Sequence, residues 1–240
     1  MLTCQPVSLG HSVNGSILFY RQFYINGNEG IMLIETESLR VFLSHADFTS
    51  ETVLEEFWQR KGSILLLISE LKFKRVRWID LPHTEYAVIS YQWKTKWGSI
   101  AKFIFGENGS PNPVRSRYLW LDLACLNQLD GNRMATIRRS DEIYFHSKEY
   151  HLMEVGSLTR GWVLFELSSV PMTLLPITHF TTTDAKILNL AKSELKRTGF
   201  EGCKFSEDSD RDLVRAKILE KYTDMDAFNE KSAAIVDTLI

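Results

Sequence analysis

Glu166 is the residue whose sequence neighbours point most clearly to chemistry. It falls in a predicted helix, and the residues three or four positions away carry no positive charge: Trp162, Val163, Ser169 and Val170. A glutamate on a solvated helix face usually has a lysine or arginine at that spacing. We therefore expect Glu166 to reach a partner elsewhere in the fold or to face a cleft, where burial would raise the pKa of its carboxyl group. The alternative is a buried structural glutamate paired with a backbone amide or with Arg160.

Asp122 is a second acidic residue in an apolar setting, near the end of the stretch Tyr118–Leu123. A buried aspartate at that point can orient a ligand hydroxyl. It can also cap the following turn, toward Asn127 and the region of Gly131, and we favour this second role. Cys125 has no histidine near it in the sequence, so we expect a small buried hydrophobic residue rather than a nucleophile.

The sequence lacks the short motifs of several common enzyme classes. It contains no G-x-x-x-x-G-K-S/T phosphate loop, G-x-G-x-x-G, H-E-x-x-H, C-x-x-C or G-x-S-x-G. The six histidines show no ligand spacing, and the three cysteines are far apart. P-loop phosphoryl transfer, zinc hydrolysis and serine hydrolysis therefore have no support from motifs, and we expect no metal and no disulfide framework.

Composition excludes further classes. The 240 residues are 44% hydrophobic and 24% charged, which is typical of a globular chain of one or two domains. Lysine and arginine number 28 against 30 acidic residues, so there is no basic footprint for nucleic acid. The longest apolar run, Ile64–Ile68, is too short to cross a bilayer, and the residues after Met1 do not form a secretory signal. We expect a cytoplasmic protein with neither nucleic acid nor membrane as a partner.

Elements that could position Glu166 and Asp122 begin at residue 86. Apolar runs rich in β-branched and aromatic residues alternate there with helical segments, as expected of a parallel sheet in an α/β fold. The predicted helices are a short one marked by Met134 and Ile137 and a longer one over Arg160–Val170. The predicted strands are Tyr86–Tyr91, Tyr118–Leu123, Glu142–His146 and Met172–Ile177.

Both flanks of this α/β segment differ from it. Residues 1–85 form an N-terminal β-rich extension with a helix over 51–60 and strands predicted at Ser16–Tyr24, Ile31–Glu35, Arg40–Ser44 and Val76–Leu81. Residues 179–240 form a C-terminal tail of three helices packed on the core. The first is capped by Asp184, ends at Gly199 and has Ile187, Leu190 and Leu195 inside; the others bury Val214, Ile218 and Tyr222, then Phe228, Ile235 and Leu239.

Polar and aromatic residues gather where the predicted strands end. Ser90, Tyr91 and Trp93 follow the first strand, and Asp122 stands at the end of the second. In an open parallel sheet, ligands bind beyond the carboxyl ends of the strands. We therefore expect these residues to line the same cleft as Glu166, although such side chains are also ordinary in loops.

Several segments, in order, resemble the Toll/interleukin-1 receptor (TIR) domain and its fungal relative, the heterokaryon-incompatibility (HET) domain. Ser90-Tyr91-Gln92-Trp93 resembles the HET motif S-Y-x-W-G, and Trp120–Gln128 resembles W-I-D-x-x-C-I-N-Q. Arg160-Gly161-Trp162 followed by Glu166 resembles the R-A-W and glutamate of both families. Weaker likenesses cover Ile137–Tyr150 and Leu174–Ile177. Lys94 and Val163 depart from the pattern, and 94–117 matches the first TIR helix poorly.

The resemblance covers 86–178 and implies a flavodoxin-like parallel sheet flanked by helices. It also implies an activity, because many TIR domains hydrolyse the nicotinamide–ribose bond of NAD with the glutamate that matches Glu166. Such an enzyme, an NAD glycohydrolase, needs no cofactor, since NAD is its substrate. Ser90, Tyr91, Trp93, Asp122 and Trp162 would then bind the ligand, with the two tryptophans able to stack on nicotinamide or adenine or to serve as core aromatics.

A different class of function is also implied. TIR and HET domains work in defence and cell-death signalling by self-association, and several have no known catalysis. In that interpretation Glu166 is an interface or structural residue and Trp93 an apolar anchor. A weaker third possibility is a sensor that binds NAD without turnover.

Overall fold

The centre of the protein is a five-stranded sheet with the order β2-β1-β4-β3-β5. The computed structural model describes residues 26–44, 71–92, 95–105, 114–126, 133–174, 182–205 and 208–238. The strands are β1 Gly30–Glu35, β2 Phe73–Arg77, β3 Ala87–Ser90, β4 Tyr118–Trp120 and β5 Glu149–Leu152. β3 pairs in parallel with both β4 and β5, whereas β1 runs antiparallel to β2 and β4. The predicted α/β class is confirmed, in the form of a mixed sheet whose strands all run one way except β1.

β3 is the strand from which the site is built. Its residues Ala87 to Ser90 are buried throughout, as expected for a strand covered on both faces. Ala87 and Val88 lie in register with Leu119 and Trp120 of β4, so the strand pair predicted to be parallel is parallel. β1 and β2 come from the predicted N-terminal extension, yet they belong to this same sheet.

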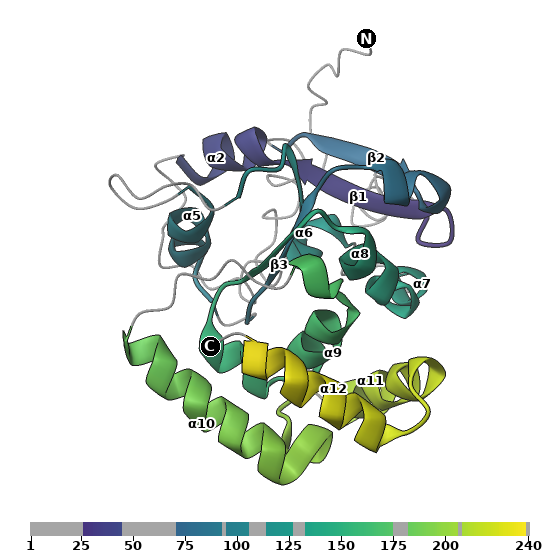
Figure 1. The fold of residues 1–240 in the computed structure, drawn as a ribbon. Coiled ribbons are helices and arrows are strands. Elements are labelled where there is room, and N and C mark those ends of the chain that lie inside the picture. The colour runs from purple at the N-terminus through teal and green to yellow at the C-terminus, as the bar shows by residue number, and fades with distance from the viewer. Residues whose placement is uncertain are drawn as a thin grey trace.

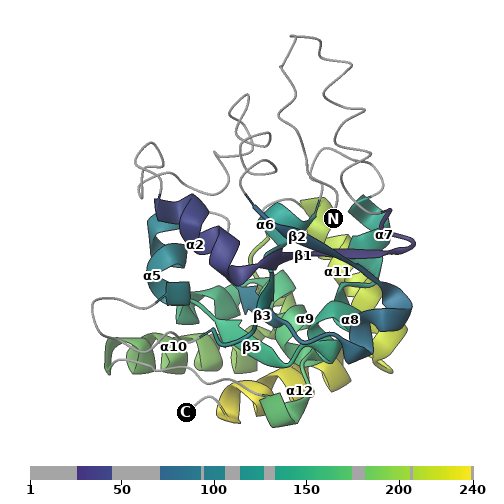
Figure 2. The ribbon, with the colours of Figure 1, turned by 90° about the horizontal axis from the view of Figure 1, so that it is seen from above.

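Helices cover the sheet on both sides. α2 (Thr36–Ser44) and α5 (Trp97–Phe105) lie together on one side, and α8 (Ser140–His146) and α9 (Gly161–Ser169) lie on the other (Figures 1 and 2). β5 shows the same division, because successive side chains of a strand point to opposite faces. The Tyr150 ring lies 6.3 Å from that of Tyr144 in α8, and the His151 ring lies 5.9 Å from that of Phe103 in α5.

Two predicted strands are helices. Residues 40–44 belong to α2, in which Leu39 and Phe42 are buried three positions apart while Arg40 and Val41 are exposed, a helical rather than an alternating pattern. Residues 142–146 belong to α8, whose first turn carries the acidic side chains that favour a helix N-terminus. The strand of that region is β5, which begins three residues after α8 ends.

Three other predicted strands are wrong in extent or in type. β2 ends at Arg77, and a 3-10 helix with a proline inside it, η1 (Trp78–His83), follows. β4 ends at Trp120, so Asp122 opens a short helix, α6 (Asp122–Cys125). Residues 172–174 form the 3-10 helix η3 (Met172–Leu174) directly after Pro171, and the rest of that predicted strand lies outside the described residues.

The predicted helices that fall within the described residues are present, but some of them bury other side chains than predicted. α7 (Arg133–Arg138) and α9 occupy the predicted places, and the tail consists of α10 (Thr182–Thr198), η4 (Gly199–Gly202), α11 (Asp208–Lys221) and α12 (Met225–Thr238). Gly199 ends α10 with a φ of 57°, a conformation that suits glycine. Asp184 lies inside α10 rather than capping it. Ile187 and Leu190 are 41% and 72% exposed instead of buried, because the inward face carries Leu188, Ala191 and Leu195.

The tail helices gather at the end of the molecule away from β1 and β2 (Figure 1), where α11 and α12 pack on α9. A 3-10 helix, η2 (Val155–Thr159), precedes α9 and contacts α10. No helix in the described ranges is both long and apolar enough to span a bilayer. Some predictions fall on residues that the structure does not describe: 16–24, 51–60, Trp93, Asn127 and Leu239.

We expect Gly30→Ala to destabilise the fold by roughly 2 kcal/mol, because the new methyl group would overpack the pairing of β1 with β2. A Cβ atom at Gly30 would lie 2.0 Å from the backbone oxygen of Val76, and backbone atoms yield little. Gly156→Ala is the matched control, since its Cβ would meet only the Gln92 amide at 3.8 Å. Urea unfolding measures both variants, and equal losses of stability would contradict the close packing at Gly30.

Candidate functional site

The candidate site lies at the carboxyl end of β3, where Ser90 meets Glu166 of α9. The Ser90 hydroxyl donates a hydrogen bond of 2.6 Å to Oε2 of Glu166 across 76 positions of sequence. Ser90 is 1% exposed, whereas Glu166 is only half-buried and keeps contact with solvent. Continuous apolar sequence buries both β3 and α9, so the two polar groups meet at the rim of an otherwise apolar core.

The surroundings of Glu166 disfavour its ionised form. Burial raises the pKa of its carboxyl group, and the nearby charge of Asp122 raises it further. Hydrogen bonds from Ser90 and Tyr144 act in the opposite direction, because they stabilise the carboxylate. Burial prevails, and the pKa is raised to about 8. Glu166 can therefore gain or lose a proton near neutral pH.

Asp122 is the second carboxylate of the site and is also half-buried. It accepts hydrogen bonds from the Tyr91 hydroxyl and, at 2.6 Å, from the Leu123 backbone amide. The same amide approaches the Tyr91 oxygen at 3.2 Å, so the three groups hold one another. Asp122 thus orients the start of α6 and, at the same time, adds negative charge beside Glu166.

Three buried tyrosines surround the two carboxylates: Tyr91, Tyr144 and Tyr150. Burial raises the pKa of each phenol, with further contributions from the negative charges nearby, so all three remain protonated hydrogen-bond donors. The Tyr144 phenol lies close enough to Glu166 to favour the ionised form of its carboxyl group. The Tyr150 hydroxyl lies beside Ser90, but among the described residues it finds no partner in hydrogen-bonding geometry.

Sequence reasoning brought together four residues that the structure also groups: Ser90, Tyr91, Asp122 and Glu166. It missed Tyr144, because residues 142–146 were interpreted as a strand. The acidic first turn of α8 was the signal that could have placed Tyr144 on a buried helix face. Trp93 lies outside the described residues.

Trp162, the other predicted stacking residue, stands one helical turn before Glu166 on α9. Its half-buried side chain packs edge-on against Phe165, with ring centroids 6.4 Å apart. The Phe165 ring also has the Lys217 ammonium group over it, 5.1 Å from the ring centre. Trp162 therefore has a structural contact of its own, and its spacing from Glu166 leaves the ligand-binding prediction open.

The chemistry available to this cluster is that of carboxyl and hydroxyl groups. Within the described ranges, no group of three or more histidine, cysteine, aspartate or glutamate side chains is placed to hold a metal ion. Cys125 is buried, and burial raises the pKa of its thiol far above neutrality, so it does not supply a thiolate nucleophile. A half-buried carboxylate pair of this kind can stabilise a developing positive charge, hold ligand hydroxyls or accept a proton.

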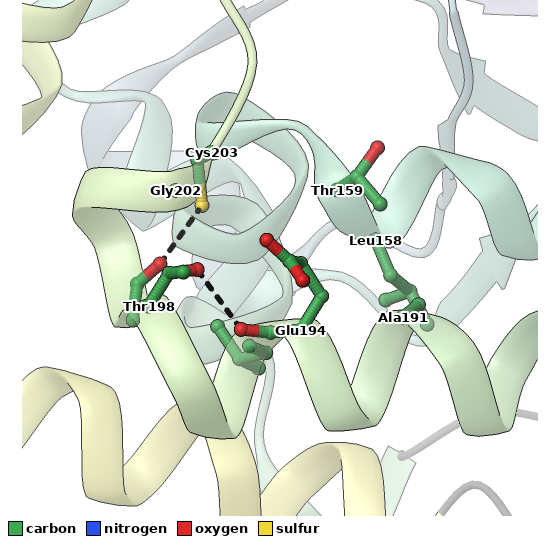
Figure 3. A pocket seen from close by; sticks show the side chains of 9 residues that line it. Leu158, Thr159, Ala191, Glu194, Thr198, Gly202 and Cys203 are labelled. Carbon is green, nitrogen blue, oxygen red and sulfur yellow. Dashed lines mark hydrogen bonds between the residues drawn. The ribbon is translucent and has the colours of Figure 1, made fainter.

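A separate pocket lies between η2 and α10 (Figure 3). Its lining includes Thr159, Glu194 and Cys203. Cys203 is buried, burial raises the pKa of its thiol to about 12, and its Sγ lies 3.8 Å from the Gly199 carbonyl oxygen. This pocket shares no residue with the Glu166 cluster, and its thiol stays protonated at neutral pH.

The comparisons with known proteins add no relative to this description. No protein-family model, curated protein or solved structure matches the chain.

Proposed function

We propose that the protein hydrolyses the nicotinamide–ribose bond of NAD, with Glu166 as the catalytic residue. The observation that carries this proposal is the half-buried Glu166 carboxyl group, held by the Ser90 hydroxyl and placed close to Asp122. Asp122 is the one charged group that acts appreciably on Glu166 within the described residues, and it is negative. The site therefore concentrates negative potential, which suits a reaction that develops positive charge on a sugar.

The proposed reaction needs only NAD and water. The N-glycosidic bond breaks, its electron pair passes to the pyridinium nitrogen, and neutral nicotinamide leaves. The ribose carbon becomes oxocarbenium-like, and the ionised Glu166 stabilises this cation or holds the ribose hydroxyls. Water adds to the carbon and gives up a proton, which Glu166 can accept. No metal or cofactor takes part.

The proposal extends to the fold and the biological setting. We infer a flavodoxin-like core of the TIR/HET kind over 86–178, working in the cytoplasm in a defence or cell-death response and self-associating on activation. The parallel pairing of β3 with β4 and β5 supports this core. So does the arrival of Ser90, Asp122 and Glu166 at one place, since each comes from a different motif of the resemblance.

The test is incubation of the purified chain with NAD, at low and high protein concentration, followed by chromatography of the products. We expect nicotinamide and free ADP-ribose in equal amounts, at a rate per molecule that rises with concentration if self-association activates the enzyme. Absence of nicotinamide even at high protein concentration would refute the activity.

A non-catalytic assembly module is the second candidate. The exposed apolar side chains of Ile187 and Leu190 on α10 favour it, because they lie on one helix face and have no role in the core. Light scattering after size exclusion measures assembly directly. Oligomers without nicotinamide release would support the module, and NAD-dependent thermal stabilisation without product would indicate a sensor.

A further inference from the structure

The hydroxyl groups around Glu166 suggest how its ionisation is set. The Ser90 hydroxyl of β3 donates to the Glu166 carboxyl group at 2.6 Å, and the Tyr144 phenol of α8 lies near the same group, so a strand and a helix that are far apart in sequence converge on it. Both side chains are buried, which leaves few alternative orientations for the two hydroxyls. A serine or tyrosine hydroxyl can donate one proton, and a carboxylate oxygen can accept several hydrogen bonds.

We propose that Ser90 and Tyr144 are positioning residues, which orient the Glu166 carboxylate and stabilise its ionised form for the NAD cleavage proposed above. This role rests on that proposed function, and it moves Ser90 from ligand binding to support of the catalytic group. A hydrogen bond to a charged group is stronger than one to a neutral group, so each hydroxyl favours the carboxylate over the acid.

Asp122 acts on Glu166 in the opposite sense. It is tied to Tyr91 and to the Leu123 amide, so its carboxyl group is held near Glu166 rather than free to turn away. Two negative charges held close together repel, which favours the neutral acid at Glu166. The site therefore contains two stabilising donors and one opposing charge around a single carboxyl group.

Charged groups on α8 and α11, which pack against α9, are engaged with one another. Lys217 and Lys221 of α11 both approach Asp141 of α8, at 3.4 and 3.8 Å. Glu142 of α8 is bound by Arg139 at 2.6 Å. The pairs with Asp141 join α11 to α8, whereas the Arg139–Glu142 pair lies within the start of α8.

The other elements packed against α9 are η2 and α12. Glu154, just before η2, accepts a hydrogen bond from Thr95 at 3.0 Å, and Lys231 of α12 lies over the Tyr222 ring at 5.4 Å. β5 contributes the uncharged phenol of Tyr150. Ser90, Tyr144 and Asp122 are therefore the groups whose removal should change the ionisation of Glu166 most.

The decisive variants remove one group each. Ser90→Ala and Tyr144→Phe delete a donor to Glu166, whereas Asp122→Asn removes the repelling charge and retains an oxygen acceptor for Tyr91 and Leu123. Ser90→Thr keeps the hydroxyl and serves as the rescue variant. Tyr150→Phe is the matched control, because it removes the phenol hydroxyl of a buried tyrosine in the same cluster that does not bond to Glu166.

Two readouts are measured on each variant. The first is the titration of the Glu166 carboxyl carbon by NMR on protein labelled with 13C-glutamate, with the resonance assigned by its absence in Glu166→Gln. The second is the pH dependence of NAD cleavage. We expect Ser90→Ala and Tyr144→Phe to move both midpoints up by roughly one pH unit, which lowers cleavage at pH 7 roughly tenfold. Asp122→Asn should move both midpoints down, and Ser90→Thr and Tyr150→Phe should leave them in place.

The two readouts separate the two proposals. If the parent chain does not cleave NAD, the proposed function fails, while the NMR midpoints still decide whether Ser90 and Tyr144 control Glu166. Unmoved midpoints in Ser90→Ala and Tyr144→Phe would overturn the positioning role even where NAD is cleaved. An equal upward shift in Tyr150→Phe would also overturn it, because a general disturbance of the cluster would then explain the result. If Ser90→Ala does not fold, Tyr144→Phe and Asp122→Asn still test the proposal, because they should shift the titration midpoint of Glu166 in opposite directions.

Discussion

Replacing Glu166 by glutamine should lower the rate of NAD cleavage roughly 100-fold or more, with the fold retained. Glutamine keeps the size of the side chain and an oxygen that can accept the Ser90 hydrogen bond of 2.6 Å. It cannot carry the negative charge that stabilises an oxocarbenium-like ribose, and it cannot accept a proton from water. The measurement is nicotinamide release under saturating NAD, at a pH above 8 where the parent glutamate is ionised.

Glu35→Gln is the matched control for this experiment. Glu35 ends β1, is partly buried and pairs with Arg117 at 3.0 Å, so the same chemical change is made at a structural carboxylate. We expect NAD cleavage in this variant to equal that of the parent. Circular dichroism checks that both variants fold. A folded Glu166→Gln protein that cleaves NAD at the parental rate would remove Glu166 from the mechanism, and loss of fold in both Glu166→Gln and Glu166→Ala would favour a structural role.

The elements that could be predicted from the sequence are those whose apolar residues fit only one kind of secondary structure. β3 is apolar up to Ser90, and α9 is apolar around Glu166 until the two serines at its end, so Ser90 and Glu166 stand out in the sequence. Their contact across 76 positions could not follow from spacing, because it depends on how β3 and α9 pack. The expectation that these two residues share a cleft came from the position of Ser90 at the carboxyl end of a predicted strand, where ligands bind in an open parallel sheet.

The segments whose secondary structure was predicted wrongly carry apolar residues at spacings that fit both a strand and a helix. Ile143, Tyr144 and Phe145 form a short apolar run typical of a strand, but the acidic residues before them start a helix, and Phe145 is left exposed. The strand that follows, β5, contains a glutamate and a histidine and is weakly apolar. Its identity is fixed by pairing with β3 rather than by its own composition. Tyr144 was missed for this reason.

The same Glu166→Gln substitution should raise the stability of the protein at alkaline pH. In the unfolded chain a glutamate ionises near pH 4.5, whereas in the fold the pKa of Glu166 is about 8. Between these values the folded state holds a proton that the unfolded state has lost, so the free energy of unfolding falls as pH rises. The loss is complete above pH 8 and amounts to roughly 3 kcal/mol once solvent contact with the half-buried side chain is allowed for. Glutamine does not titrate and escapes this loss.

The measurement is urea unfolding of the parent and of Glu166→Gln from pH 4 to pH 9. The difference between the two proteins should be small at pH 4, should grow in favour of the variant through pH 8 and should then level off. His146, whose pKa is lowered mainly by burial, titrates in both proteins and cancels in the difference.

Glu149→Gln should change the pH dependence of stability in the opposite direction. Burial raises the pKa of Glu149, but hydrogen bonds from His151, the Arg115 amide and Ser116 outweigh burial and lower it to about 2. Glu149 therefore stabilises the fold above about pH 4.5, and this contribution is lost as pH falls toward 2. The glutamine variant should be less stable than the parent by a constant amount from pH 5 to pH 9. A carboxyl group that stabilises the fold and one that strains it can thus be told apart by the sign of their pH dependence. A flat difference for Glu166→Gln over the same range would place Glu166 with Glu149, among the structural carboxylates.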